Sequence, residues 1–219
     1  MKKLLYLSLL TLCLSQSACT MMVKGLAKLV VKEYNNHTDI KFSNLQLADS
    51  SGKTQTFGEI FKGKTVYLYL WKNQKNTPPN ENNKAYKALK ERFAKYPDVT
   101  FANLYIGQDH LSTSYKLVES EYSKQIFTLL SVENPTPFII GKDGSILSYK
   151  GPQPNNTTLV DYVLYQANQG EDGTKAAKRL IKGVNGKQRF RSEKLRVWYT
   201  NHFGKAPDET LNFSVSTSQ

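Results

Sequence analysis

Few residues in this sequence could act as nucleophiles or metal ligands. The chain of 219 residues has two cysteines, Cys13 and Cys19, and three histidines. The histidines, His37, His110 and His202, lie far apart and show none of the paired spacings of zinc sites. No Gly-x-Ser-x-Gly element is present to support a hydrolase. We therefore expect no metal, no cofactor and no hydrolase centre.

Lys75 is one candidate nucleophile of another kind. It stands just before Pro78-Pro79, where proline favours the start of a helix. The positive end of a helix dipole disfavours a charged amine, and a neutral lysine is a nucleophile. The alternative is an ordinary solvated loop lysine. The asparagines around it could present amides to a ligand or simply serve turns and caps.

The elements that must position this loop are predicted from hydrophobic periodicity. Residues 65–71 are apolar or aromatic at nearly every position, which favours a central strand covered on both faces. A helix to about Tyr96 and a strand at 99–106 follow, which predicts a right-handed parallel crossover. Residues 107–132 favour one or two helices. Residues 135–149 predict a strand, an Asp-Gly turn and an antiparallel strand, and a helix at 157–169 closes an α/β domain over 39–169.

The N-terminus has the pattern of an export signal. A basic start precedes an apolar stretch from Leu4 to Leu14, so residues 1–18 are predicted to be a signal peptide. Ser17 and Ala18 before Cys19 resemble a bacterial lipobox, although Gln16 replaces its usual aliphatic residue, and this resemblance implies lipidation of Cys19. The alternative is cleavage near Ala18 that leaves Cys19 as a free thiol.

Residues 19–38 are predicted to be an amphipathic tether helix behind the anchor. No acidic residue follows Cys19 closely, and we expect the protein on the periplasmic face of the outer membrane. Loss of Lys2 and Lys3 lowers the formal charge from +12 to +10. Such a protein suits anionic neighbours in the envelope, whereas its location argues against nucleic acid.

Three short stretches of residues 42–167 together resemble a known family. They are Leu45-Gln46-Leu47 ahead of Asp49-Ser50-Ser51-Gly52, Phe61-Lys62-Gly63-Lys64 leading into residues 66–71, and Thr136-Pro137 before Phe138-Ile139-Ile140-Gly141-Lys142-Asp143-Gly144. In this order they are similar to exported thioredoxin-like proteins of the TlpA and peroxiredoxin-related kind. The resemblance implies a thioredoxin-like central mixed sheet flanked by helices.

The resemblance also implies a redox site that this sequence lacks. In the family a Cys-x-x-Cys pair follows the tryptophan at the strand end, and here Lys75 and Pro78 occupy those two positions. Neither can form the thiolate that thiol-disulfide exchange requires. The degenerate active-site loop comprises Trp71, Lys72, Asn73, Gln74, Lys75, Asn76, Thr77 and Pro78.

Pro137 resembles the cis-proline of the family, beside which an extended peptide is held. The resemblance implies a cis-proline ledge at Thr136 and Pro137 that could survive the loss of redox chemistry. The alternative is an ordinary trans proline at a strand start.

Residues 170–219 are predicted to be a basic C-terminal extension with its own character. Between Thr174 and Lys205 the sequence has ten lysines and arginines against Glu193 alone. Either this surface docks on an anionic partner, aided by interfacial aromatics, or it is a solvated cap whose aromatics fold back. The predicted contacts are Lys178, Arg179, Lys182, Arg189, Arg191, Lys194, Arg196 and Trp198.

Three functions remain open from the sequence. The first is a redox-inactive, thioredoxin-like envelope lipoprotein that binds or scaffolds an envelope protein or an anionic membrane surface. The second is a member of the thiol-disulfide oxidoreductase family with non-classical catalysis in the loop after Trp71. The third is a membrane-associated assembly or stress factor that acts through its basic tail. The sequence leaves the oligomeric state open.

Overall fold

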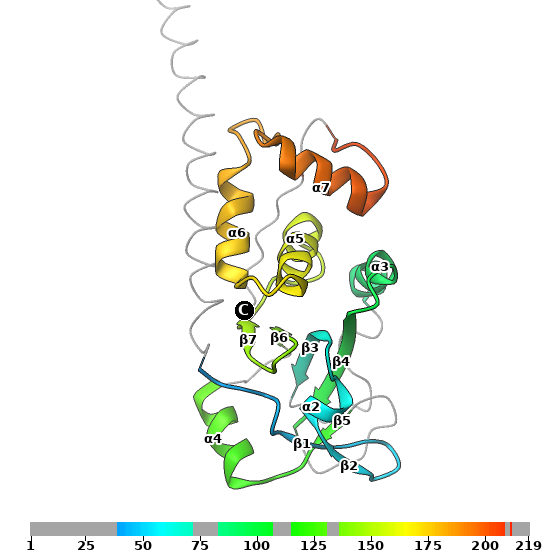
Figure 1. The fold of residues 1–219 in the computed structure, drawn as a ribbon, viewed down its shortest axis with the longest axis vertical. Helices are drawn as coiled ribbons and strands as arrows, with labels where there is room; N and C mark the ends of the chain where they lie inside the picture. The colour runs from blue at the N-terminus through cyan, green and yellow to red at the C-terminus, as the bar shows by residue number, and fades with distance from the viewer. Residues whose placement is uncertain (1–38, 72–82, 107–114, 131–135, 209–210, 212–219) are drawn as a thin grey trace, which may run out of the picture.

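The computed structural model describes residues 39–71, 83–106, 115–130, 136–208 and 211 (Figure 1). In these residues a seven-stranded sheet runs in the order β2-β1-β5-β4-β3-β6-β7. The strands are β1 (Gln46–Ala48), β2 (Thr54–Thr56), β3 (Thr65–Trp71), β4 (Val99–Tyr105), β5 (Tyr115–Leu117), β6 (Thr136–Ile140) and β7 (Ile146–Ser148). The helices are α2 (Phe57–Ile60), α3 (Lys84–Phe93), α4 (Glu121–Leu130), α5 (Thr157–Asn168), α6 (Gly173–Lys182) and α7 (Glu193–Phe203).

Strand β3 is the middle of the sheet, as its apolar sequence predicts. All its residues are buried, and it pairs in parallel with β4 and antiparallel with β6. Because side chains alternate along a strand, Tyr67 and Tyr69 enter one hydrophobic cluster while Leu68 and Leu70 enter the other. Both faces of the sheet are therefore covered.

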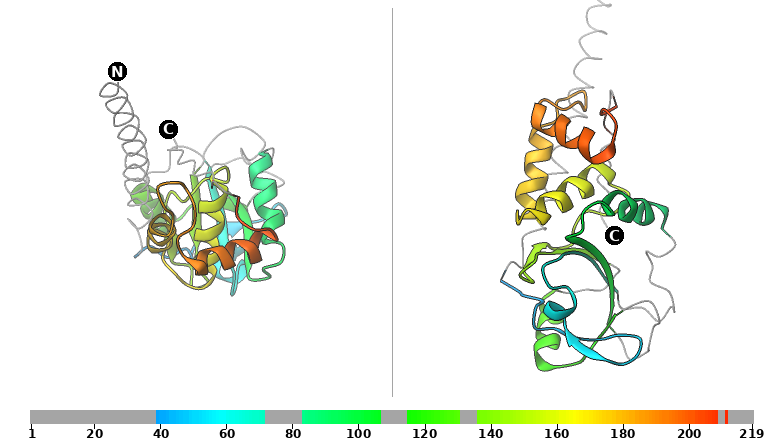
Figure 2. Two further views of the ribbon diagram at one scale, coloured as in Figure 1. Left: turned by 90° about the horizontal axis from the view of Figure 1, so that it is seen from above. Right: turned by 45° about the vertical axis from the view of Figure 1, so that its right-hand side comes forward.

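The helices divide between these two faces. Helices α3 and α5 lie against the face that carries Tyr67 and Tyr69, and α6 and α7 pack on α5 (Figures 1 and 2). Phe57 of α2 and Ile126 of α4 join the opposite cluster, together with Phe42. The molecule consequently has a three-layered arrangement, with α6 and α7 added at one end.

This connectivity confirms the predicted α/β class. Strand β3, helix α3 and strand β4 form a parallel crossover, and β6 with β7 forms an antiparallel hairpin that leads into α5. The strand order β4-β3-β6-β7, with α3 between β3 and β4 and α5 after β7, is a thioredoxin-like arrangement. The Asp143-Gly144 turn of the hairpin is present, with Gly144 at a φ of +81°.

Several boundaries differ from the predicted ones. Helix α3 begins at Lys84, where the side chain of Asn83 accepts hydrogen bonds from two helical N–H groups, whereas the predicted start at Pro78 lies outside the described residues. Ahead of β2 the described chain forms only the short strand β1 and one bridge at Lys41. The segment 107–132, predicted to contain one or two helices, also contains β5, because its backbone pairs with both β1 and β4.

The described part of the predicted C-terminal extension is packed against α5. Helices α6 and α7 bury apolar side chains in the same cluster as α3, α5 and β3, among them Ala176, Ala177, Leu180, Leu195 and Trp198. A shared core of this kind makes α6 and α7 part of the domain.

Helix α6 also covers one edge of the sheet. A Cβ atom on Gly173 would lie 2.9 Å from the carbonyl oxygen of Leu147 and from the side chain of Ser148 in the edge strand β7. Only glycine permits this approach without a shift. The helix thus shields backbone groups of an edge strand that would otherwise face solvent.

Candidate functional site

Trp71 occupies the end of β3, where the degenerate loop begins. It lies beside Tyr105, the last residue of the parallel strand β4, with 4.8 Å between ring centroids. Both rings are buried, and in the described structure the Trp71 indole Nε1 has no hydrogen-bond partner. The carboxyl ends of parallel strands are the usual ligand-binding edge of open α/β sheets.

The remaining loop residues, 72–78, lie outside the described part of the chain, and so does Cys19. The sequence itself contains no cysteine after residue 19, so the described domain has no thiol.

Pro137 does not show the predicted cis bond, because the described residues contain no cis peptide. Pro137 pairs with Tyr69 and Thr136 with Leu70, which places both in an interior strand between β3 and β7. The Pro137 carbonyl oxygen accepts a hydrogen bond of 2.7 Å from the Gly151 N–H.

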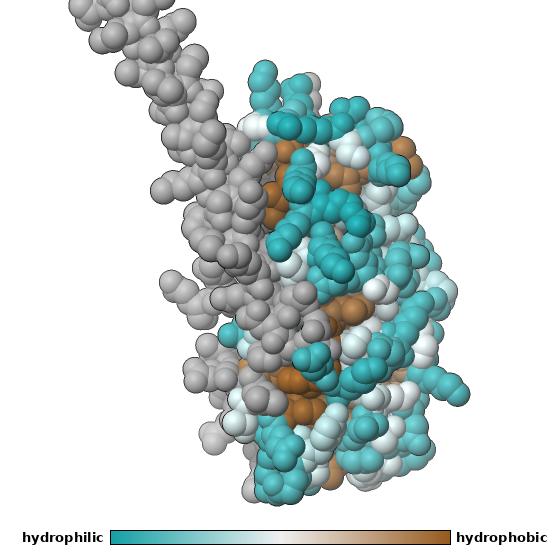
Figure 3. Space-filling view, turned by 60° about the vertical axis from the view of Figure 1, so that its left-hand side comes forward, coloured by the Kyte–Doolittle hydropathy of each residue, from teal (hydrophilic) through white to brown (hydrophobic). Residues whose placement is uncertain are grey.

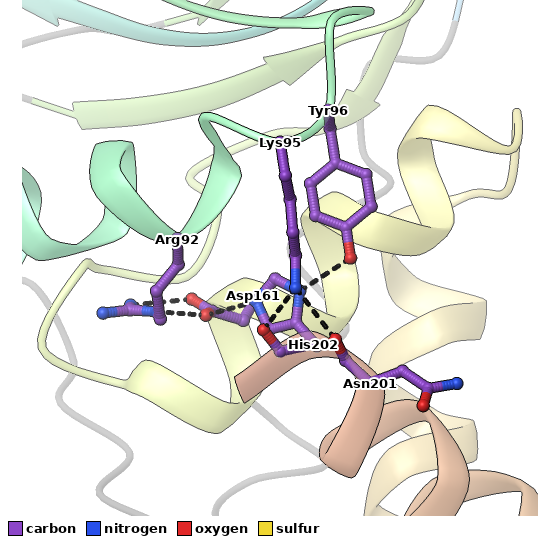
Figure 4. A network of polar contacts seen from close by, with 6 residues as sticks. All are labelled: Arg92, Lys95, Tyr96, Asp161, Asn201 and His202. Atoms are coloured by element: carbon purple, nitrogen blue, oxygen red, sulfur yellow. Dashed lines mark hydrogen bonds and ion pairs between the residues drawn. The ribbon is translucent and has the colours of Figure 1, made fainter. Parts of the chain in front are cut away.

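A buried polar network joins α3, α5 and α7 (Figure 4). Asp161 of α5 is fully buried, and Arg92 of α3 donates to its two carboxylate oxygens over 2.5 and 2.9 Å. This two-point geometry is the strongest that an arginine makes with a carboxylate. Arg92 thus supplies the positive charge that offsets the Asp161 carboxylate.

His202 of α7 completes this network. Its Nε2 lies 2.7 Å from Asp161 Oδ2, and its Nδ1 lies 3.0 Å from the Tyr96 hydroxyl. Burial, with smaller effects from Tyr165 and Asp161, raises the pKa of Tyr96, which keeps its hydroxyl protonated. With the Tyr96 O–H donating to Nδ1, the Nε2–H donates to Asp161, so both ring nitrogens are satisfied.

Further contacts hold the same end of α7. The Lys95 ammonium donates to the carbonyl oxygens of Asn201 and His202 over 2.8 and 2.7 Å, where a cation favours the negative end of the helix. The His202 ring also stacks on Trp198, with an interplanar angle of 13°.

The network positions helices and is closed to a substrate. Asp161 and His202 have side chains with no exposed surface, so no reactant can reach them without unfolding. The only sign of this network in the local sequence was an aspartate, Asp161, among the apolar residues of α5. Its partners are 69 and 41 positions away, and sequence reasoning therefore missed them.

The predicted basic contacts fall into two groups. Arg179 pairs with Glu171 and Arg196 pairs with Glu193, although both arginines are on the surface. The other predicted cations, all exposed, are Lys178, Lys182, Arg189, Arg191 and Lys194. The surface therefore retains most of the positive charge that the sequence predicts.

Trp198 does not belong to this surface. Its side chain is buried against Tyr162, Tyr165 and His202, and 8% of the residue is exposed. Phe190 and Tyr199 are buried too. The sequence left open whether these aromatics would face a partner or fold back onto the domain, and in the structure they fold back.

In the described residues, no group of three or more histidine, cysteine, aspartate or glutamate side chains could hold a metal ion. Nor does any described helix combine the length and apolar character that a bilayer crossing requires.

Comparison with solved structures returns thioredoxin-like proteins. A proposed thiol-disulfide oxidoreductase from Bacteroides vulgatus is 22% identical over 53% of this chain and 89% of its own, with a TM-score of 0.40. A domain of a proposed thiol-disulfide isomerase from Cytophaga hutchinsonii is 17% identical over 59% and 92%, with a TM-score of 0.42. The exposed lipoprotein thioredoxin of Streptococcus pneumoniae is 20% identical over 46% and 83%, with a TM-score of 0.30.

No protein-family profile matches the sequence, and a search of curated proteins gave no match. The strand order and the placement of the helices define the fold.

Proposed function

We propose that this protein is a thioredoxin-like binding or scaffolding module of the bacterial envelope that works without thiol chemistry. The observation that carries the proposal is a thioredoxin-like domain without a cysteine after residue 19. Disulfide exchange requires one thiolate to attack and a second sulfur to resolve the mixed disulfide. A domain with neither retains the scaffold and its surfaces.

The end of β3 supports a binding role for this module. The Trp71 indole N–H is a buried donor without a partner in the described structure, and such a group costs free energy unless something accepts from it. It lies at the carboxyl ends of β3 and β4, next to the Tyr105 ring. Because Trp71 is fully buried, a carbonyl oxygen of a bound peptide would reach this N–H only after the surrounding side chains move aside.

A disulfide-reduction assay tests the absence of thiol chemistry. The full chain and its Cys19→Ser variant, each with dithiothreitol as reductant, should reduce insulin no faster than dithiothreitol alone. Turnover above that rate in both proteins would overturn the proposal, because it would show a disulfide-reducing activity that does not need Cys19. Turnover lost with Cys19 would also overturn it, by assigning a redox role to that thiol.

Lipidation of Cys19 and location at the periplasmic face of the outer membrane belong to the same proposal. They rest on the sequence from residue 1 to residue 19. In a bacterial host the wild-type chain should incorporate labelled fatty acid and sediment with outer membranes, whereas Cys19→Ser should do neither. A Cys19→Ser chain that still carries the label would contradict the anchor.

A further inference from the structure

We infer that the outer face of α6, the turn at residues 183–191 and the start of α7 together form a docking surface for an anionic lipid bilayer. We call it the basic face. This inference concerns a different surface from the Trp71 end of the sheet, and it holds whether or not that end binds a peptide.

Helix α6 contributes one side of the basic face. Its apolar side chains, including Ala177 and Leu180, are buried against α5, so the lysines between them must point outward. Lys178 and Lys182 are one helical turn apart and both are exposed.

The turn after α6 adds cations at alternate positions. Val184 forms a bridge with Phe190, and the Arg191 N–H donates to the Gly183 carbonyl oxygen over 2.7 Å, so this turn has an extended return arm. Since alternate residues of an extended segment share a side, buried Phe190 leaves Arg189 and Arg191 on the other side.

The geometry brings these charges to one end of the molecule. In Figure 1, α6 and α7 lie at the end opposite α4 and β2, and Figure 3 shows mostly hydrophilic side chains over that end. No ion pair is found within the described residues for Lys175, Lys178, Lys182, Lys187, Arg191 and Lys194. These six cations define the basic face.

The buried network holds the basic face in place. Asp161 and Lys95 fix the C-terminal end of α7, while Trp198 and Leu195 fill the space against α5 and α6. Packed helices therefore present the positive surface.

The residues around these charges favour a lipid bilayer as the binding partner. Phe190, Trp198 and Tyr199 are buried and Phe203 is partly buried against the same cluster, so the face lacks the exposed aromatic platforms that single-stranded nucleic acid requires. Val197, half exposed on α7, instead offers an aliphatic contact beside Arg196. A predicted acyl anchor at Cys19 would keep the chain within reach of lipid.

Because the aromatics are buried, attraction to lipid phosphates must supply most of the binding. A basic residue near an anionic bilayer contributes about 1 kcal/mol, or about fivefold in partitioning. Removing three cations should then weaken binding about a hundredfold, and added salt should do the same by screening.

The test compares two triple variants of the full chain with equal change in net charge. In one, Lys182, Lys187 and Lys194 become Gln; in the control, Lys53, Lys62 and Lys87, which are exposed elsewhere on the domain, become Gln. Each is sedimented with phosphatidylcholine vesicles with and without phosphatidylglycerol. The ratio of binding with phosphatidylglycerol to binding without it measures the electrostatic contribution. Any anchoring through the N-terminus is the same in all the proteins and cancels from this ratio.

The first variant should lose about a hundredfold of the preference for phosphatidylglycerol, and the control should lose less than about fivefold. Equal losses of this preference in the two variants would overturn the inference, because net charge alone would then explain binding to the anionic lipid. A preference that survives high salt would overturn it as well. So would tighter binding of duplex DNA than of anionic vesicles through the same three lysines.

Discussion

At Asp161 a carboxylate is held in the apolar core by two partners at once. Arg92 donates hydrogen bonds to both carboxylate oxygens and the His202 ring contacts one of them, so the negative charge of Asp161 is locally compensated. Removing one member of a buried pair leaves the other uncompensated, which costs more than the pair contributed.

We therefore expect Asp161→Asn to lower the free energy of unfolding by about 3 kcal/mol, as measured by urea denaturation. The matched control is Asp98→Asn, whose pair with Lys142 is about half exposed and should contribute less than about 1 kcal/mol. If both substitutions lowered the free energy of unfolding equally, the buried network would not be what holds α3, α5 and α7 together.

Asp143, in the turn between β6 and β7, makes a pH-dependent contribution. The Ser145 hydroxyl is the main cause that lowers its pKa to about 2, with the Ser145 N–H and Lys41 assisting against some desolvation. An unfolded aspartate titrates near 3.9. The folded state thus gains stability above about pH 4 and loses it as the pH falls through about 2.

Because the Asp143 side chain is largely exposed, this gain should stay below about 1 kcal/mol. Chemical denaturation at a series of pH values should show wild type slightly more stable than Asp143→Asn near pH 5. The difference should close near pH 2. A difference that stays constant with pH would show that the substitution acts through the shape of the turn.

At the scale of elements, α6 depends on one glycine. Gly173 lies where α6 meets the edge strand β7, and an added methyl group would overlap Leu147 and Ser148. We expect Gly173→Ala to cost about 2 kcal/mol of unfolding free energy, since packed elements must separate to admit it.

Lys175→Ala, on the exposed side of the same helix, should change stability by less than about 0.5 kcal/mol and serves as the control. Thermal unfolding of the two variants separates these outcomes. A Gly173→Ala chain as stable as the control would mean that α6 does not rest on β7.

For the whole molecule, shared packing decides where the domain ends. A chain that stops at Gly170 would expose the side of α5 that carries Tyr162, Val163 and Ala167, and would uncover β7. We expect it to lose cooperative unfolding and to aggregate, as monitored by calorimetry and light scattering.

A chain that stops at Leu211 retains every described residue and should unfold as one unit, close to the wild type. If the chain that stops at Gly170 also unfolded cooperatively, this result would support the predicted domain boundary at residue 169.

Charge is distributed unevenly over the same molecule. Most of the predicted net charge of +10 falls between residues 174 and 205, at the end formed by α6 and α7. A positive pole of this kind orients a protein against a negative surface before any specific contact forms.

The sequence by itself determined the α/β class, the burial of β3 and the absence of a redox cysteine pair, because these follow from local periodicity and from residue identity. It also placed ten cations in one stretch. The local sequence does not decide whether Trp198 faces solvent, because the same neighbouring residues could accompany a buried or an exposed side chain.

Tertiary structure decided that question. Trp198 packs on Tyr162 because α7 folds back onto α5, and that return depends on the contact of Asp161 with His202, which are 41 positions apart. Helical spacing can show which side chains share a face, but only the packing of α3, α5 and α7 selects what that face meets. The basic face is thus encoded as charge and positioned by contacts that the sequence pattern does not show.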